Sequence, residues 1–261
     1  MGRVRAGFAV VVLAVLTIVL MPLQILATRR HWPLAARLPH IWQKIAARLL
    51  GIRVTVSGVP GEPPLLLASN HVSWLDIVVL SVPLPISFIA KSEVAGWPAI
   101  GTLARLQRTI FVEREKRAKT VAVGETIARR IDRGDVMLLF AEGTTGDGRH
   151  VLPFKSALLG AAGAAVGGDR PVTVQPVAIV YRSIHGLPLG YADWSEVAWY
   201  GDMDLIPHFL RLAGLGAIDA TVCFGRPIPF PPDVDRKALT RACHSEVRKM
   251  VADLRHLPSS P

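Results

Sequence analysis

An apolar run opens the chain. Residues 7–27 carry no charged side chain, and their polar interruptions are Thr17 and Gln24. At about 1.5 Å of rise per residue, a helix over this run is just long enough to cross a hydrocarbon core of about 30 Å. A cleaved signal peptide is the competing interpretation, although the run is longer than a typical signal core and contains Pro22. We therefore expect a membrane-associated helix that either spans the bilayer or lies in one leaflet.

A helical pattern follows this run. Between Trp32 and Ile52, apolar side chains recur at three- and four-residue spacing with basic side chains between them. The pattern is typical of a helix that lies in the membrane interface, and the alternative is a helix whose apolar face packs on the rest of the protein. Residues 1–52 are therefore predicted to form a membrane-associated helical hairpin. Because more basic residues follow the first run than precede it, the remainder of the chain is expected on the cytoplasmic side.

Strand-like and helix-like segments alternate from Arg53 onward. This alternation predicts an α/β fold, a single domain over residues 53–261 with a mixed, largely parallel central sheet flanked by helices. Pro176 interrupts one apolar run, which predicts a strand kink or an edge position. Strands are expected at residues 54–57, 65–68, 86–90, 109–112, 136–140, 172–180 and 220–224, and helices at residues 73–80, 100–106, 119–132, 156–166, 204–212 and 236–254.

Composition narrows the class of protein. Of the 261 residues, 51% are hydrophobic, and the mean hydropathy of +0.37 excludes a disordered chain. The net charge of +10 favours anionic partners such as nucleic acid, acidic lipid or an acidic carrier protein. The basic residues are dispersed and no zinc-finger, RNA-recognition or phosphate-loop signature occurs, which argues against nucleic acid. Cys223 and Cys243 indicate neither a disulfide framework nor a thiolate metal site.

The first candidate for chemistry is a histidine and a carboxylate that follow the apolar strand at residues 65–68. His71 and Asp76 stand at the carboxyl end of that strand, where open α/β sheets place their active sites. Five helical steps would separate the two side chains by about 140°, so they can pair only if the helix begins after His71. Ser73 is a good N-cap and forms a capping-box pattern with Asp76, which predicts a helix start at that serine.

Two interpretations of this pair stay open. Asp76 can be a capping carboxylate and His71 a loop histidine. Alternatively, the carboxylate holds one ring nitrogen and leaves the other to take a proton from a hydroxyl group. No G-x-S-x-G motif occurs, so that hydroxyl would belong to a substrate. No metal or cofactor is expected, because the chain has no H-E-x-x-H or C-x-x-C spacing.

A second candidate follows the strand at residues 136–140. Glu142 and the small and hydroxyl residues after it can form a concave turn that holds a polar headgroup, and the alternative is a plain turn with a solvated glutamate. Arg114, just after the strand at residues 109–112, is either a surface arginine or an anion clamp.

The order of these segments resembles the four sequence blocks of the glycerophospholipid (1-acylglycerol-3-phosphate) acyltransferase family. The resemblance covers roughly residues 64–181 and includes the segment at residues 175–177. It implies that His71 is the base that activates a lysolipid hydroxyl for attack on an acyl thioester, and that Asp76 supports this histidine. It also implies acceptor-binding roles for the residues of the second and third blocks, here Arg114, Glu142, Gly143, Thr144 and Thr145.

The third block departs from the family pattern Phe-Pro-Glu-Gly-Thr-Arg at two positions. Ala141 replaces the proline, and Thr145 replaces the arginine. Because threonine cannot supply the bidentate guanidinium that suits a phosphate dianion, a phosphate-bearing acceptor is less well matched.

The segments at residues 142–158 and 198–204 look like the lyso-ornithine lipid acyltransferase branch. That branch implies O-acylation of a lyso-ornithine lipid with acyl carrier protein as donor, at the cytoplasmic face of a bacterial inner membrane. Asp147 is either an extra carboxylate for the ornithine ammonium group or a turn-forming residue. A 1-acylglycerol-3-phosphate O-acyltransferase is the alternative within the family, and a non-catalytic membrane-binding protein is the alternative outside it.

Overall fold

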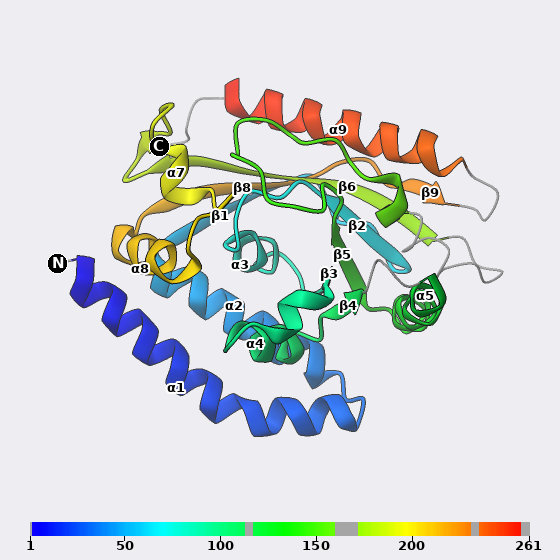
Figure 1. Cartoon of the computed structure of the whole chain (residues 1–261), viewed down its shortest axis with the longest axis horizontal. Helices are drawn as coiled ribbons and strands as arrows, with labels where there is room; N and C mark the ends of the chain where they lie inside the picture. Colours follow the sequence, from blue (N-terminus) through cyan, green and yellow to red (C-terminus); the bar gives the residue numbers. More distant parts are fainter. Residues whose placement is uncertain (1, 113–116, 160–171, 231–234, 257–261) are drawn as a thin grey trace.

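The structure of the protein is a computed structural model that describes residues 2–112, 117–159, 172–230 and 235–256. The described residues form three layers, with a central sheet between two groups of helices (Figure 1). The strands are β1 (Ile52–Ser57), β2 (Leu65–Ser69), β3 (Ile86–Lys91), β4 (Ile110–Val112), β5 (Val136–Phe140), β6 (Val172–Ile184), β7 (Leu187–Pro188), β8 (Ile218–Phe224) and β9 (Ile228–Phe230). The helices are α1 (Gly2–Arg29), α2 (Leu34–Leu50), α3 (Asp76–Leu80), the 3-10 helix η1 (Ser92–Gly96), α4 (Ile100–Leu106), α5 (Arg117–Asp132), α7 (Trp194–Val197), α8 (Leu205–Leu215) and α9 (Arg236–His256).

The sheet has the order β1-β8-β6-β2-β5-β3-β4, and β7 and β9 also pair with β6. The pairs β1·β8, β2·β5, β2·β6, β3·β4 and β3·β5 are parallel, whereas β6 pairs in antiparallel fashion with β7, β8 and β9. The predicted mixed, largely parallel sheet is therefore confirmed. The parallel register brings the carboxyl ends of β2, β5 and β3 to one edge, because Ser69 pairs with Phe140 and Ile89 pairs with Leu139.

Burial on both faces explains why the central strands read as continuous apolar runs. All five residues of β2 are buried, although successive side chains point to opposite faces of a sheet. Leu65 and Leu67 join the core beneath α1, α2, α3 and α8, and Leu66 and Ala68 join the core beneath α5 and α9.

Pro176 lies inside β6, a central strand flanked by β2 and β8, so the predicted edge position is wrong. Its partners explain why proline is tolerated there. β9 pairs with β6 up to Val174 and β8 pairs from Val177 onward, so Pro176 stands at the join between them. The carbonyl oxygen of Pro176 accepts the N–H of Gly225, between β8 and β9, at 2.8 Å. Because Pro176 itself is paired with neither β8 nor β9, its missing N–H costs neither strand a hydrogen bond.

Other differences concern short elements and boundaries. β7, β9, η1 and α7 were not predicted, because segments of two to five residues carry no readable periodicity. Of the helix predicted at residues 156–166, residues 156–159 are helical and residues 160–166 lie outside the described part of the chain.

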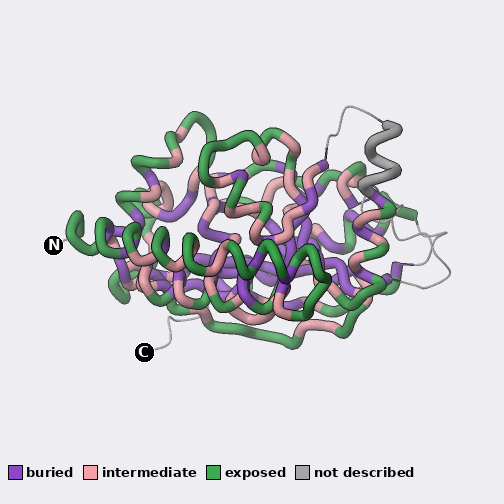
Figure 2. Tube along the Cα trace, turned by 90° about the horizontal axis from the view of Figure 1, so that it is seen from below, coloured by how far each residue is buried: buried purple, intermediate pink, exposed green. Residues whose placement is uncertain are grey.

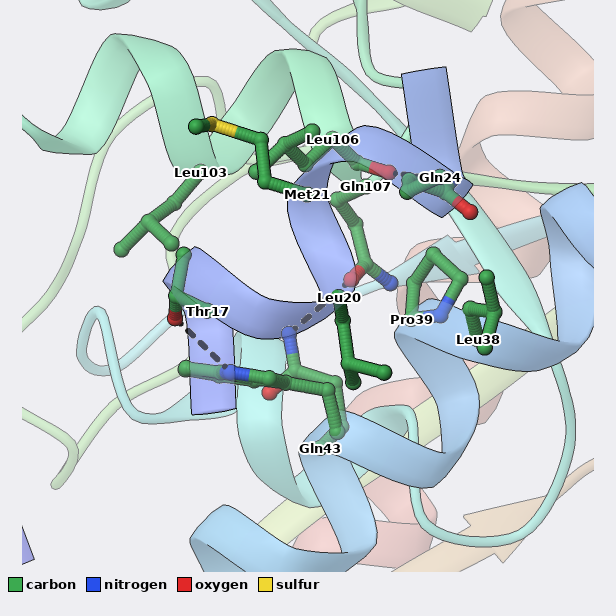
Figure 3. A pocket seen from close by; sticks show the side chains of 11 residues that line it. Thr17, Leu20, Met21, Gln24, Leu38, Pro39, Gln43, Leu103, Leu106 and Gln107 are labelled. Atoms are coloured by element: carbon green, nitrogen blue, oxygen red, sulfur yellow. Dashed lines mark hydrogen bonds between the residues drawn. The ribbon is translucent and has the colours of Figure 1, made fainter. Parts of the chain in front are cut away.

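Glutamine side chains attach the N-terminal helices to the domain (Figure 3). Gln24 of α1 donates from Nε2 to the carbonyl oxygen of Leu106 in α4, at 2.7 Å. Gln43 of α2 donates to Oε1 of Gln107 at 3.0 Å, and Gln107 donates to the carbonyl oxygen of Ile86 at 3.1 Å. A cavity of about 50 Å³ lies at this junction; its apolar lining includes Leu20, Met21, Leu38, Trp42, Leu103 and Leu106.

The outer face of α1 is apolar and exposed. Figure 2, seen from below, shows α1 lying lengthwise along the molecule with much of its length exposed. Val4, Phe8 and Ile18 each expose more than half of their surface, whereas Ala6, Ala9 and Leu13 are buried against the domain. By its length and composition, α1 is also long and apolar enough to cross a membrane.

Candidate active site

The candidate active site lies at the carboxyl edge of the sheet, directly after β2. β2 runs between β5 and β6, so the residues that follow it emerge near the middle of the sheet. His71 stands two residues beyond the end of β2, and α3 begins only at Asp76. The backbone between them is a turn, as the pairing of these two side chains requires.

His71 and Asp76 form a close dyad. The Nδ1 atom of His71 lies 2.8 Å from the Oδ2 atom of Asp76. The Asp76 side chain is fully buried, while 18% of the His71 side chain is exposed. Since the carboxylate fixes the proton on Nδ1, Nε2 is left as the proton acceptor, and it makes no hydrogen bond to the described part of the chain.

The carboxylate of Asp76 is surrounded by donors. Its Oδ2 atom also accepts the backbone N–H groups of Val72 at 2.6 Å and Ser73 at 3.0 Å. Its Oδ1 atom accepts the hydroxyl of Tyr181 at 2.7 Å. Burial, and then the charge of Asp76 and its hydrogen bond, raise the pKa of Tyr181 well above its usual value, so this phenol remains a donor. These contacts suit an ionised carboxylate, which only accepts hydrogen bonds.

The predicted N-cap at Ser73 is wrong. α3 begins at Asp76, and its N-cap residue, Leu75, makes no side-chain cap hydrogen bond. The Ser73 hydroxyl is buried and has no partner within the described residues. One half of the predicted capping box is present, because Asp76 Oδ2 accepts the N–H of Ser73 at 3.0 Å. The other half is missing, and because the same oxygen also binds the imidazole of His71, the helix begins at Asp76.

The turn after β5 fixes the backbone of His71 on both sides. The Oε1 atom of Glu142 accepts the N–H of His71 at 3.2 Å, and Gly146 donates its N–H to the carbonyl oxygen of His71 at 2.9 Å. The ring of Phe140 stacks on the imidazole, with centroids 3.7 Å apart and an interplanar angle of 12°. The first and third sequence blocks therefore form one structural unit.

Glu142 is buried rather than solvated. Only 2% of its surface is exposed, and Oε2 has no hydrogen-bond partner among the described residues. Burial raises the pKa of Glu142 to about 8, against the opposing effect of the backbone N–H groups of His71 and Leu152. The alternative of a plain turn with a solvated glutamate is excluded.

The raised pKa of Glu142 makes a testable prediction about stability. The folded protein holds a proton that the unfolded chain releases at ordinary glutamate pKa, so stability should fall as the pH rises from about 4.5 to about 8. A shift of one pKa unit corresponds to about 1.4 kcal/mol, which predicts a loss of a few kcal/mol across that window. The Glu142→Gln variant mimics the protonated side chain and should remove most of this slope.

Urea unfolding between about pH 5 and about pH 9 would measure this effect. The matched control is Glu125→Gln, which changes an exposed glutamate of α5 and should leave the slope unchanged. Parallel slopes for wild type and Glu142→Gln would contradict the buried proton.

The remaining residues with predicted acceptor-binding roles differ in how far they are exposed to solvent. Gly143 is buried with a φ of +74°, Thr145 is half-buried, and Thr144 is exposed. Arg114 lies outside the described residues. No group of three or more His, Cys, Asp or Glu side chains that could hold a metal ion occurs within the described ranges.

Asp147 serves the turn. Its Oδ1 atom accepts the N–H groups of Arg149 at 2.9 Å and His150 at 3.2 Å, and its Oδ2 atom accepts the Arg149 guanidinium at 2.9 Å. These contacts support the turn-forming interpretation and give this carboxylate a cation partner within the chain.

Sequence reasoning missed two supports of the dyad. Tyr181 comes from β6, 105 positions from Asp76 in the chain. Trp199 donates its backbone N–H to the carbonyl oxygen of Val72 at 3.0 Å. A buried tyrosine in an otherwise apolar strand is a signal that could have identified Tyr181, since a buried phenol needs a hydrogen-bond partner. A backbone contact such as that of Trp199 leaves no signal in the residue type.

Comparison with known proteins adds independent findings. A family model described as "Acyltransferase" matches residues 52–180, which include His71, Asp76 and Glu142. The chain is similar to a protein named "Lyso-ornithine lipid O-acyltransferase" from Brucella abortus, with 47% identity over 96% of this chain and 95% of the relative. A protein of the same name from Rhizobium meliloti is 42% identical over 96% of this chain and 87% of the relative.

More distant similarities follow. A "1-acyl-sn-glycerol-3-phosphate acyltransferase" from Neisseria gonorrhoeae is 30% identical over 80% of this chain and 78% of its own length. The crystal structure of the 1-acyl-sn-glycerophosphate (LPA) acyltransferase, PlsC, from Thermotoga maritima superposes with a TM-score of 0.66 and covers 100% of both chains. Its 18% sequence identity supports the fold alone.

Proposed function

Since this chain belongs to the acyltransferase family, and is an O-acyltransferase of membrane lipids, we propose that it transfers an acyl chain from acyl carrier protein to the hydroxyl of a lyso-ornithine lipid. The observation that carries the proposed chemistry is the 2.8 Å contact between His71 Nδ1 and Asp76 Oδ2. It orients the imidazole so that Nε2 can act as a base.

The proposed mechanism uses His71 twice. Nε2 takes the proton of the acceptor hydroxyl as that oxygen attacks the thioester carbonyl carbon, and Asp76 stabilises the imidazolium that forms. The tetrahedral intermediate then collapses: the carbon–sulfur bond breaks, the ester remains on the acceptor, and the thiolate takes the proton back from Nε2. The acyl group therefore passes directly from the thioester to the acceptor hydroxyl, without an acyl-enzyme intermediate.

Two observations support a lyso-ornithine lipid as acceptor. The relatives that carry this name are 47% and 42% identical, whereas the 1-acyl-sn-glycerol-3-phosphate acyltransferase from Neisseria gonorrhoeae is 30% identical. Thr145, at the position of the family arginine, offers no guanidinium for a phosphate. Glu142 supports the reaction in this proposal through the backbone of His71, beside any role of its turn in acceptor binding.

Acyl carrier protein is the proposed donor because the two charges are complementary. The chain carries a net charge of +10, which favours encounter with an acidic carrier protein.

An assay with purified protein tests acceptor and donor together. Acyl carrier protein thioesters and coenzyme A thioesters are each supplied with lyso-ornithine lipid or lysophosphatidate, and products are identified by mass spectrometry. We expect diacylated ornithine lipid from the carrier-protein thioester. Product formed from lysophosphatidate alone would replace the proposed acceptor with the glycerophosphate alternative, and product formed from coenzyme A thioester alone would replace the proposed donor.

We further propose that residues 1–52 hold the domain on the inner membrane, with α1 in one leaflet and the active site on the cytoplasmic face. α1 is bonded towards both of its ends: Arg5 donates to the carbonyl oxygen of Leu49 in α2 at 3.2 Å, and Gln24 donates to that of Leu106 in α4 at 2.7 Å. Arg5 and Gln24 are 19 residues apart in this helix, or about 28 Å along its axis, so a spanning orientation would put the two contacts at opposite sides of a hydrocarbon core of about 30 Å. An orientation in the membrane plane keeps both contacts and immerses the exposed apolar face.

Cysteine labelling distinguishes these orientations. Arg3 lies in the first turn of α1 and His31 lies two residues beyond its end, and both are exposed. Arg3→Cys and His31→Cys are each introduced into a background without Cys223 and Cys243. In intact spheroplasts a membrane-impermeant maleimide should label neither site, and after lysis it should label both. Labelling of one end alone in intact spheroplasts would establish a spanning helix.

A further inference from the structure

Trp74 connects the turn at residues 71–76, which we call the catalytic turn, to α8. It lies between His71 and Asp76 in the sequence, and its side chain reaches two consecutive residues of α8. The indole Nε1–H donates to Nδ1 of His208 at 3.0 Å. The ring of Phe209 lies 5.2 Å from the indole at an interplanar angle of 47°. Apolar packing and one directed hydrogen bond therefore act on the same side chain.

The hydrogen bond defines the protonation of His208. An indole N–H can only donate, so Nδ1 of His208 must be unprotonated and the ring proton sits on Nε2. Only 3% of His208 is exposed. Burial, and then the nearby Arg211, lower the pKa of His208, against an opposing effect of the backbone of Ala198 and Ser195. The neutral ring is the form that can accept the Trp74 hydrogen bond, and its Nε2–H has no hydrogen-bond partner among the described residues.

The catalytic turn has a second support from the same direction. Trp199 donates its backbone N–H to the carbonyl oxygen of Val72 at 3.0 Å. His208 is bonded to Trp74, and its ring also lies near the backbone of Ala198, the residue that precedes Trp199. The backbone that carries the dyad is therefore held at Val72 and at Trp74 by the segment that contains α7 and α8.

We propose that His208 is a positioning residue for acyl transfer: its Nδ1 atom holds Trp74, and through it the turn that sets the distance between His71 and Asp76. This inference rests on the proposed role of the dyad. His208 touches no reacting atom, so its loss should slow the chemical step and leave acceptor binding nearly unchanged.

Two substitutions of His208 distinguish the effect of its hydrogen-bond acceptor from the effect of the volume that its side chain fills. Asn places an oxygen acceptor where Nδ1 stands, whereas Leu fills much of the volume and offers no acceptor. We expect His208→Leu to lower kcat about tenfold with KM for the acceptor within about twofold, because small misplacement of a catalytic group acts on the chemical step. His208→Asn should keep at least about half of the wild-type kcat.

Trp74→Phe keeps an aromatic ring for Phe209 and removes the donor, so it should reproduce the effect of His208→Leu. The double variant Trp74→Phe/His208→Leu should lose no more than either single variant, since both remove the same bond. If His208→Leu does not fold, the comparison of Trp74→Phe with His208→Asn carries the test.

Three outcomes would overturn the inference: His208→Leu or Trp74→Phe within about twofold of wild-type kcat, equal losses for His208→Asn and His208→Leu, or additive losses in the double variant. Each variant is assayed with lyso-ornithine lipid and with lysophosphatidate. A wild-type enzyme that acylates lysophosphatidate alone would overturn the proposed acceptor, and the His208 comparison would then be made on lysophosphatidate.

Discussion

Replacement of Asp76 by asparagine should lower kcat by about 10²–10⁴-fold while the protein stays folded, because without the carboxylate charge the imidazolium of His71 is no longer stabilised and most of the general-base contribution is lost. The surroundings of Asp76 make this a test of charge. The N–H groups of Val72 and Ser73 both point at the Oδ2 position, so they will hold the amide oxygen of the new side chain there. That oxygen can still accept the Nδ1–H of His71, so the tautomer is preserved and the counter-charge of the imidazolium is lost.

Purified wild type and variants would be compared by acyl-transfer rates and by thermal unfolding. Tyr181→Phe is the matched control, because it removes one donor to Asp76 and leaves the carboxylate charged. We expect it to cost about 1–3 kcal/mol of stability, since Oδ1 loses its hydrogen-bond partner, and to lower kcat less than tenfold. His71→Ala should be at least as inactive as Asp76→Asn. An Asp76→Asn enzyme within about threefold of wild type would show that the carboxylate charge has no part in the reaction.

The fold could be predicted where a strand is buried on both faces and its sequence is therefore a continuous apolar run. β2 and β5 are apolar runs because helices cover both faces of the sheet, and their predicted positions agree with the structure to within one residue. Prediction failed where a tertiary contact sets the local geometry. The sequence predicts a capping box at Ser73, and Asp76 does accept the N–H of Ser73, but the same carboxylate also binds the imidazole. The Ser73 hydroxyl makes no cap bond to the described residues, and α3 starts three residues later.

The site could be predicted only in part, for a similar reason. The spacing of His71 and Asp76 allowed a dyad once the helix start was moved, and the structure places the two side chains 2.8 Å apart. Tyr181 could not be assigned to Asp76, because that contact depends on how β6 and β2 align in the sheet. Glu142 could be read as a solvated turn residue, because nothing in the sequence tells that its turn folds back onto His71.

Replacement of Gly148 by alanine should destabilise the protein by about 2–5 kcal/mol and lower acyl transfer at least tenfold. Gly148 has a φ of +75°, which costs an alanine about 1–2 kcal/mol. A Cβ atom there would also lie 2.5 Å from the Trp194 ring and 2.9 Å from a methyl group of Val72. Overpacking of this kind adds about 1–3 kcal/mol. Since the N–H of Val72 binds Asp76, displacement of Val72 should disturb the dyad as well as the fold.

Gly186→Ala separates these two effects. Gly186 has a φ of +78°, close to that of Gly148, but a Cβ atom there would meet no atom within 4 Å. Both variants should therefore lose the same conformational contribution in urea unfolding, and only Gly148→Ala should lose further stability and activity. Equal unfolding free energies with equal rates would mean that Trp194 moves aside without shifting Val72. The geometry argues against that result, because Arg255 packs over the Trp194 ring and also donates to the carbonyl oxygen of Gly148, so the ring is held beside the residue that would have to displace it.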